Sequence, residues 1–176
     1  MTDQYVPKDY YGRSPNKSGV PEALPEDVST IEAIIRASYE TLSGNAGVPR
    51  QWDRMRSLFL PDSRSIRTGV LADGTIGYRR MNTEEFIEQV NDWLVETGFF
   101  ETEIHRLVEQ FGNIAHVFST YESRRTLEDA KPFMRGINSY QLFHDGQRWW
   151  IMTVMWRHES ADLPIPARYL PPETEF

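Results

Sequence analysis

The sequence predicts an α+β fold in which helices pack on one face of a mostly antiparallel sheet. Apolar residues recur at helical spacing over roughly the first hundred residues, and they alternate at strand spacing from Phe99 onward. Turn sequences stand at two joints of the alternating part, Gly112-Asn113 and Asp145-Gly146, as β-hairpins require. The length of 176 residues fits one domain with tails.

Proline and glycine divide the chain into a domain and two arms. Residues 1–26 hold four prolines and two glycines without any period, and residues 160–176 hold four more prolines. We interpret these segments as an N-terminal and a C-terminal arm. The domain between them covers residues 27–159.

Three helices are expected in the first part of the domain. One begins at the capping-box pattern Ser29–Glu32, with Asp27 as an alternative cap, and ends at Gly44. A second covers about Pro49–Leu60, because proline suits a first helical turn. The third begins at the cap residue Asn82 and ends at Gly98.

A sheet is expected to follow the helices. Asp73-Gly74 predicts a small hairpin between the second and third helices. The four long strands of a meander are predicted over Phe99–Gln110, Ile114–Leu127, Arg135–Phe143 and Arg148–His158.

The last of these strands is apolar on both of its alternating faces. Trp149 and Ile151 stand on one phase, and Trp150 and Met152 stand on the other. Helices cover only one face of such a sheet, so the other face needs a second cover. We predict a symmetric homodimer that packs sheet to sheet; an arm folded over that face is the alternative. The residues of the predicted dimer face are Phe118, Trp150, Met152, Val154 and Trp156.

The composition excludes several functions. The 26 acidic and 19 basic residues give a net charge of -7, which argues against a general nucleic-acid binder. The absence of cysteine excludes disulfides, thiol catalysis and thiolate metal sites. Neither a secretory signal nor a run of roughly 20 apolar residues is found. We expect a cytoplasmic protein without a membrane partner.

The order of the elements resembles the nuclear transport factor 2-like superfamily, in its polyketide-cyclase (SnoaL-like) branch. The stretches that carry the resemblance are Trp52–Asp62, Gly112–Val117, Arg135–Ser139 and Asp145–Ile151. It implies a cystatin-like cone, in which three helices pack in the concave face of a strongly curved sheet, and frequent dimerisation through that sheet. The superfamily includes isomerases, dehydratases, epoxide hydrolases and non-catalytic modules, so the fold does not choose an activity.

The resemblance also implies a pocket at the open end of the cone. If Ala115 and Val117 contact the helices, strand alternation directs Ser119 and Tyr121 into the cavity. The expected ligand-binding residues are Tyr39, Trp52, Ser119, Tyr121, Asn138, Thr153 and Met155. Aromatic walls with a few neutral polar groups suit a small apolar molecule with one or two polar atoms. The tyrosines are equally explained as core residues.

Acid–base catalysis requires a desolvated carboxylate or histidine in that pocket. Asp53 on the second helix is the candidate that we select as general base, although a first-turn aspartate is also favoured by the helix dipole. Glu101, Glu103 and His105 share one strand phase, which is also explained as a solvated face.

The four histidines have no metal-site spacing, so we expect no metal and no cofactor. Two functions stay open. The first is a non-catalytic dimeric binding module, which we favour because the expected pocket positions on the strands carry no carboxylate. The second is a lyase, isomerase or hydrolase that uses Asp53.

Overall fold

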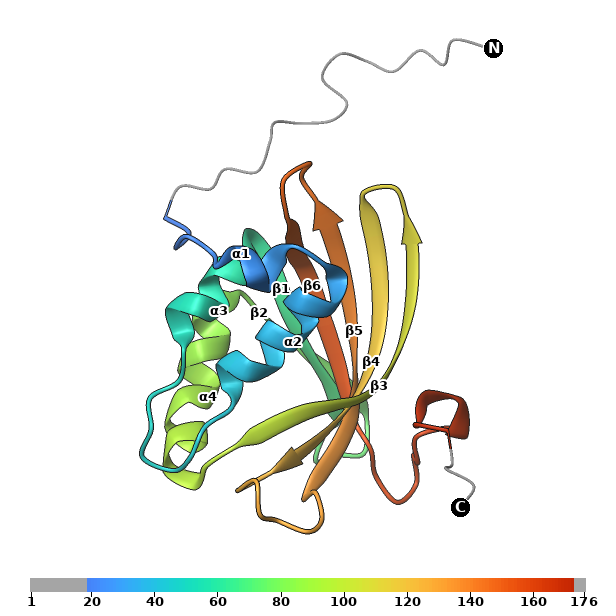
Figure 1. Cartoon of the computed structure of the whole chain (residues 1–176). Helices are drawn as coiled ribbons and strands as arrows, with labels where there is room; N and C mark the ends of the chain where they lie inside the picture. Colours follow the sequence, from blue (N-terminus) through green and yellow to red (C-terminus); the bar gives the residue numbers. More distant parts are fainter. Residues whose placement is uncertain (1–18, 173–176) are drawn as a thin grey trace, which may run out of the picture.

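The computed structural model describes residues 19–172 and shows one six-stranded sheet with the α-helices gathered on one of its faces (Figure 1). The elements in chain order are α1 (Pro25–Val28), α2 (Ile31–Leu42), α3 (Trp52–Leu58), β1 (Phe59–Val70), β2 (Ile76–Met81), α4 (Thr83–Thr97), β3 (Phe100–Phe111), β4 (Ile114–Arg124), β5 (Met134–His144), β6 (Trp149–His158) and the 3-10 helix η1 (Ala167–Tyr169). The predicted α+β class is confirmed. Most of the predicted N-terminal arm lies outside the described residues.

The sheet is mixed, because one pair of neighbouring strands is parallel. The strand order is β2-β1-β6-β5-β4-β3, and β1 runs parallel to β6. The predicted hairpin around Asp73-Gly74 is formed by β1 and β2. This hairpin adds two strands to the sheet at the side of β6, and Arg67 of β1 pairs there with Trp156 of β6.

Side-chain caps fix where two helices begin. The hydroxyl of Thr30 accepts a hydrogen bond from the backbone N–H of Ala33 at 3.0 Å, inside the predicted Ser29–Glu32 pattern. Asn82 and Glu85 form the predicted capping box of α4. The second helix ends at Leu58, two residues earlier than predicted, because the chain enters β1 there.

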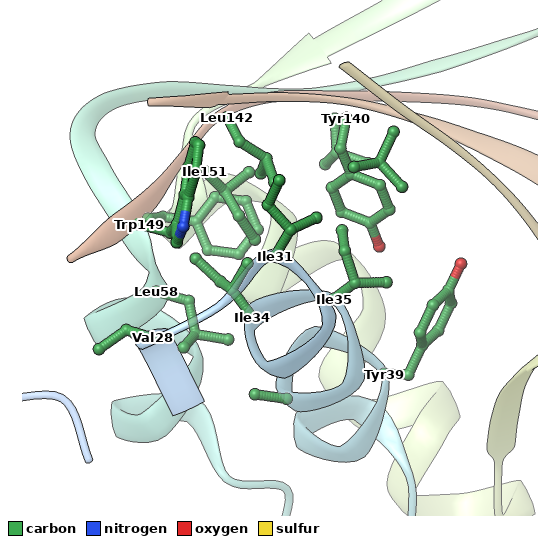
Figure 2. Close-up of a cluster of buried hydrophobic side chains, with 14 of the residues drawn as sticks. Val28, Ile31, Ile34, Ile35, Tyr39, Leu58, Tyr140, Leu142, Trp149 and Ile151 are labelled. Carbon is green, nitrogen blue, oxygen red and sulfur yellow. The ribbon is translucent and has the colours of Figure 1, made fainter. Parts of the chain in front are cut away.

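The hydrophobic core fills one end of the space between the helices and the sheet. Figure 2 shows Ile31 of α2 directed toward Leu142 of β5 and Ile35 directed toward Tyr140. Ile34 is fully buried in the same cluster. Strand β6 contributes Trp149 and Ile151 from its first half and Val154 from its second half, and Val154 also lines a cavity.

A β-bulge at Met152 divides β6 into these two halves. Leu142 pairs with Ile151, but Gln141 pairs with Thr153, so Met152 is an extra residue with no partner in β5. An extra residue reverses the alternation of side chains beyond it. The face that β6 presents to the helices therefore changes phase at this position.

The bulge corrects four of the predicted strand positions. Val154 and Trp156 face the helices and line a cavity, although they were assigned to the outer dimer face. Thr153 and Met155 were assigned to the pocket, but the structure places them on the outer side, where Met155 is 43% exposed. The uninterrupted alternation assumed from the sequence does not hold across Met152.

A second bulge interrupts β3 at Ile104. Glu103 pairs with Tyr121, and His105 pairs with Thr120. Glu101 and Glu103 therefore face the helices, whereas His105 faces the opposite side. The row of three titratable residues predicted from the sequence is divided between the two faces.

The chain after β6 returns to the outer face of β4. The rings of Phe118 and Tyr169 lie 4.9 Å apart, and the hydroxyl of Thr120 donates a hydrogen bond of 2.6 Å to the carbonyl oxygen of Tyr169. Trp150 is only 1% exposed, and its indole N–H donates to Asp145. These two residues of the predicted dimer face thus have contacts within the chain.

Candidate functional site

A cavity of about 560 Å³ lies between α4 and the sheet, where it is lined by residues of β1, β3, β4, β5 and β6. This volume falls within the roughly 300–1,000 Å³ of small-molecule sites. From α4 it is lined by Phe86, Val90 and Trp93, because the apolar face of this helix turns toward the strands. The walls are mostly apolar, and two groups of polar side chains among the lining residues are described below.

The first polar place is built around Glu101, at the beginning of β3. The hydroxyl of Ser123, directly opposite on β4, donates a hydrogen bond of 3.2 Å to Glu101 Oε2. Burial raises the pKa of the Glu101 carboxyl to about 7, against the lowering effect of its hydrogen bonds with Ser123 and Asn138. Glu101 therefore exists in both its protonated and its ionised form near neutral pH.

A network of buried hydrogen bonds holds the side chain of Asn138 in place. Its amide donates a hydrogen bond of 3.1 Å to the hydroxyl of Tyr39, which in turn lies 2.7 Å from the hydroxyl of Ser119. Ser119 donates to Glu103 Oε1 at 2.5 Å. Burial raises the pKa of the Tyr39 phenol well above its usual value, so the phenol stays neutral. The network fixes the side chain that lies beside Glu101.

The second polar place combines Arg67 of β1, Tyr121 of β4 and His158 of β6, all of which line the cavity. Burial, together with the positive charges of Arg67 and Arg157, lowers the pKa of His158 to about 4. Burial also raises the pKa of the Tyr121 phenol. At neutral pH this place therefore holds one fixed positive charge and two neutral side chains.

Of the seven predicted ligand-binding residues, Tyr121 and Asn138 line the cavity. Tyr39 and Ser119 belong to the network behind Asn138. Trp52 packs against the core, and its indole N–H donates a hydrogen bond of 2.8 Å to Asn91. Thr153 and Met155 lie on the outer side, as described above.

Asp53 does not reach the cavity. Its side chain is 85% exposed and makes an ion pair of 2.8 Å with Arg56. Helix α3 turns this first-turn residue toward solvent, while Met55 faces inward and lines the cavity. We therefore assign no proton-transfer role to Asp53.

Sequence reasoning missed Arg67 and His158 entirely. Both belong to the cavity because β1 pairs with β6 in parallel, a contact between segments about 90 residues apart. No local pattern marks such a pairing. Glu101 was among the candidates from the sequence, in one row with His105. The bulge in β3 places the two side chains on opposite faces of the sheet, and the sequence does not reveal that bulge.

No cluster of three or more histidine, aspartate or glutamate side chains that could hold a metal ion occurs within residues 19–172. In the same part of the chain, no helix is long and apolar enough to cross a membrane.

No protein-family model and no curated protein matches the sequence. Solved structures resemble its fold. One is a protein of unknown function with a cystatin-like fold from Nostoc punctiforme, with a TM-score of 0.57 and 11% identity over 74% of this chain and 90% of that one. An NTF2-like protein of unknown function from Silicibacter pomeroyi has a TM-score of 0.51 and 15% identity over 74% of this chain and 94% of that one.

LinA is also similar in structure, with a TM-score of 0.57 and 10% identity over 82% of this chain and 92% of LinA. Identities this low establish the fold alone. The chain has the cystatin-like fold of nuclear transport factor 2-like proteins, as the sequence resemblance implied.

Proposed function

We propose that the chain binds a small, largely apolar molecule in the cavity and that Glu101 exchanges a proton with it. The observation that carries this proposal is a carboxyl group in a mostly apolar cavity, with its pKa raised to about 7. A general acid–base works best when its pKa lies near the operating pH.

The surroundings of Glu101 support the same role. Ser123 and Asn138 hold the carboxyl group from the side of the sheet. No lysine or arginine within residues 19–172 forms an ion pair with Glu101, so no positive charge fixes it in the ionised form. Proton abstraction and return suit a lyase or isomerase reaction more than a hydrolysis.

The experiment begins with a fragment library screened for binding by ligand-observed NMR. Fragments that bind are incubated in D₂O with the wild type and with Glu101→Gln. We expect deuterium to enter an acidic C–H position of at least one fragment with the wild type only. Glu88→Gln, at an exposed position of α4, is the matched control and should exchange like the wild type.

Two outcomes would contradict this proposal. Equal deuterium incorporation with the wild type and Glu101→Gln would remove Glu101 from the reaction. Binding that survives Val90→Trp, which fills the cavity, would show that the fragments bind elsewhere. Binding without any exchange would instead support a non-catalytic binding module.

We also propose a homodimer that packs through the outer face of the sheet. Met152, Met155 and Leu107 are 45%, 43% and 43% exposed and support an apolar contact there. Light scattering should report a dimer for the wild type and a monomer for Met155→Lys. A wild-type monomer at micromolar concentration would overturn this part of the proposal.

A further inference from the structure

Three polar side chains of the cavity have no partner in the described part of the chain. Arg67, Tyr121 and His158 line the cavity, yet none of them makes a hydrogen bond or an ion pair with any residue from 19 to 172. Tyr121 is buried, where polar groups are almost always satisfied, whereas His158 is half-buried and Arg67 is exposed to solvent. These three are therefore available to a molecule that enters the cavity.

The sheet register brings the three side chains to one area. Tyr121 of β4 pairs with Gly136 of β5, and Gly136 pairs with His158 of β6. Gly136 has no side chain that would separate Tyr121 from His158. The phenol of Tyr121 occupies the place of that side chain, since a Cβ atom at Gly136 would lie 2.5 Å from Tyr121 Oη. Arg67 approaches from β1, where it pairs with Trp156 two residues before His158.

The cavity-lining side chains of this area carry one positive charge. The guanidinium of Arg67 is permanently charged, and its field is felt by both His158 and Tyr121. The other two groups are neutral donors at pH 7, since His158 titrates at about 4. Glu101 forms no ion pair with Arg67, so the positive charge is not neutralised from within the cavity.

We propose that the ligand of this cavity is a monocarboxylate with an apolar ring or chain. Its carboxylate binds the guanidinium of Arg67 and accepts hydrogen bonds from Tyr121 and His158, while its carbon body lies against Phe86 and Trp156. The inference deepens the proposed function, because it concerns the same cavity.

Two arguments favour a carboxylate over other anions. The guanidinium and the carboxylate are both planar, so a single arginine can donate two parallel hydrogen bonds to the two oxygens of one carboxylate. A phosphate monoester carries about two negative charges, and within residues 19–172 only one arginine lines the cavity. The Glu101 carboxyl adds further negative charge when it ionises, which disfavours a dianion in the same space.

The test compares acids with their own amides, which keep the carbon body but replace the charged carboxylate by a neutral head group. The probes are phenylacetate, trans-cinnamate and 2-naphthoate, with phenylacetamide, trans-cinnamamide and 2-naphthamide. Binding to the full chain is measured by isothermal titration calorimetry. We expect at least one acid to bind about tenfold or more tightly than its amide, as a charged hydrogen bond predicts.

Variants then assign the difference to Arg67. Arg67→Gln should weaken the acid about tenfold or more and leave the amide unchanged. Arg157→Gln is the matched control: it removes the same charge next to His158, from a side chain that does not line the cavity. This control should bind the acid within about twofold of the wild type.

A spectroscopic readout separates direct contact from a general charge effect. The charged or titratable groups around His158 are Arg67, Arg157 and Tyr121. A bound carboxylate adds a negative charge beside the imidazole, so the pKa of His158 measured by NMR should rise from about 4 when the acid is added. The amide should not change it.

The outcomes separate this inference from the proposed function. Equal binding of every acid and its amide overturns the carboxylate and leaves proton exchange by Glu101 untouched. Absence of binding by all three acids at millimolar concentration also overturns it, and so does tighter binding of phenyl phosphate than of phenylacetate. An acid preference that survives Arg67→Gln overturns the assignment to Arg67.

Discussion

The hydroxyl of Tyr121 occupies the place of a side chain at Gly136: a Cβ atom there would stand 2.5 Å from Tyr121 Oη and 2.6 Å from the carbonyl oxygen of Arg157. Gly136→Ala should therefore displace the phenol and lower the free energy of unfolding by about 1–3 kcal/mol. Urea unfolding measures the loss. Gly69→Ala, whose Cβ would meet only the flexible end of Arg157 at 3.3 Å, is the control and should change stability little. Equal effects of the two variants would contradict the close packing described here.

Glu101 should make the stability of the protein fall as the pH rises. Its pKa is about 7 in the folded state, against about 4.5 when unfolded, so the folded state holds the proton longer. The stabilisation is complete below pH 4.5 and is lost toward pH 7, at most about 1.4 kcal/mol per pH unit. Unfolding of wild type and Glu101→Gln across this range should show the variant gaining relative stability with pH. Parallel curves would place the pKa of Glu101 near its ordinary value.

His158 should act in the opposite direction. Its pKa is lowered from 6.5 to about 4, so the unfolded state binds the proton first as the pH falls. Stability is therefore lost between pH 6.5 and about 4 and is complete above 6.5. His158→Gln should remove this loss, as measured by denaturant unfolding over the same interval. His144→Gln, at the end of β5 outside the cavity, serves as the comparison. A loss that persists in His158→Gln would have to come from other groups.

The ion pair of Asp27 and Arg54 should be the most costly to break. The Asp27 side chain is 2% exposed and accepts two hydrogen bonds of 2.7 Å from the guanidinium. Arg54→Met leaves a buried carboxylate without its partner, which costs about 3–5 kcal/mol of unfolding free energy. Arg56→Met breaks pairs with the exposed Glu84 and Asp53 and should cost about 1 kcal/mol or less. Thermal and urea unfolding of the two variants would refute this ranking if Arg56→Met were the more damaging.

Local patterns in the sequence predicted most of the fold. The cap of α4 lies at the predicted Asn82, whereas the cap of α2 is Thr30, one residue after the Ser29 that the capping-box pattern indicated. The hairpin turns Gly112-Asn113 and Asp145-Gly146 likewise join the strands they were expected to join. These features are set by neighbours in the chain, so a single sequence contains them.

The candidate site was only partly predictable, because it depends on distant pairing and on strand irregularities. Tyr121 was identified by alternation along β4, whereas Asn138 was selected without a decided strand phase; both line the cavity. Arg67 entered the site through the parallel contact of β1 with β6, which no local signal specifies. Asp53 was selected for its chemistry, but the orientation of a short helix decided its exposure.

The extra residue at Met152 gives the two halves of β6 different surroundings. Before it, Trp149 and Ile151 belong to the packed core; after it, Trp156 and His158 belong to the wall of the cavity. A substitution at His158 would therefore change the cavity wall, whereas a substitution at Trp149 or Ile151 would change the core. Removal of Met152 would reverse the alternation after it, so that Val154 and Trp156 would turn outward and Thr153 and Met155 would turn inward. The bulge thus decides which side chains of β6 the cavity contains.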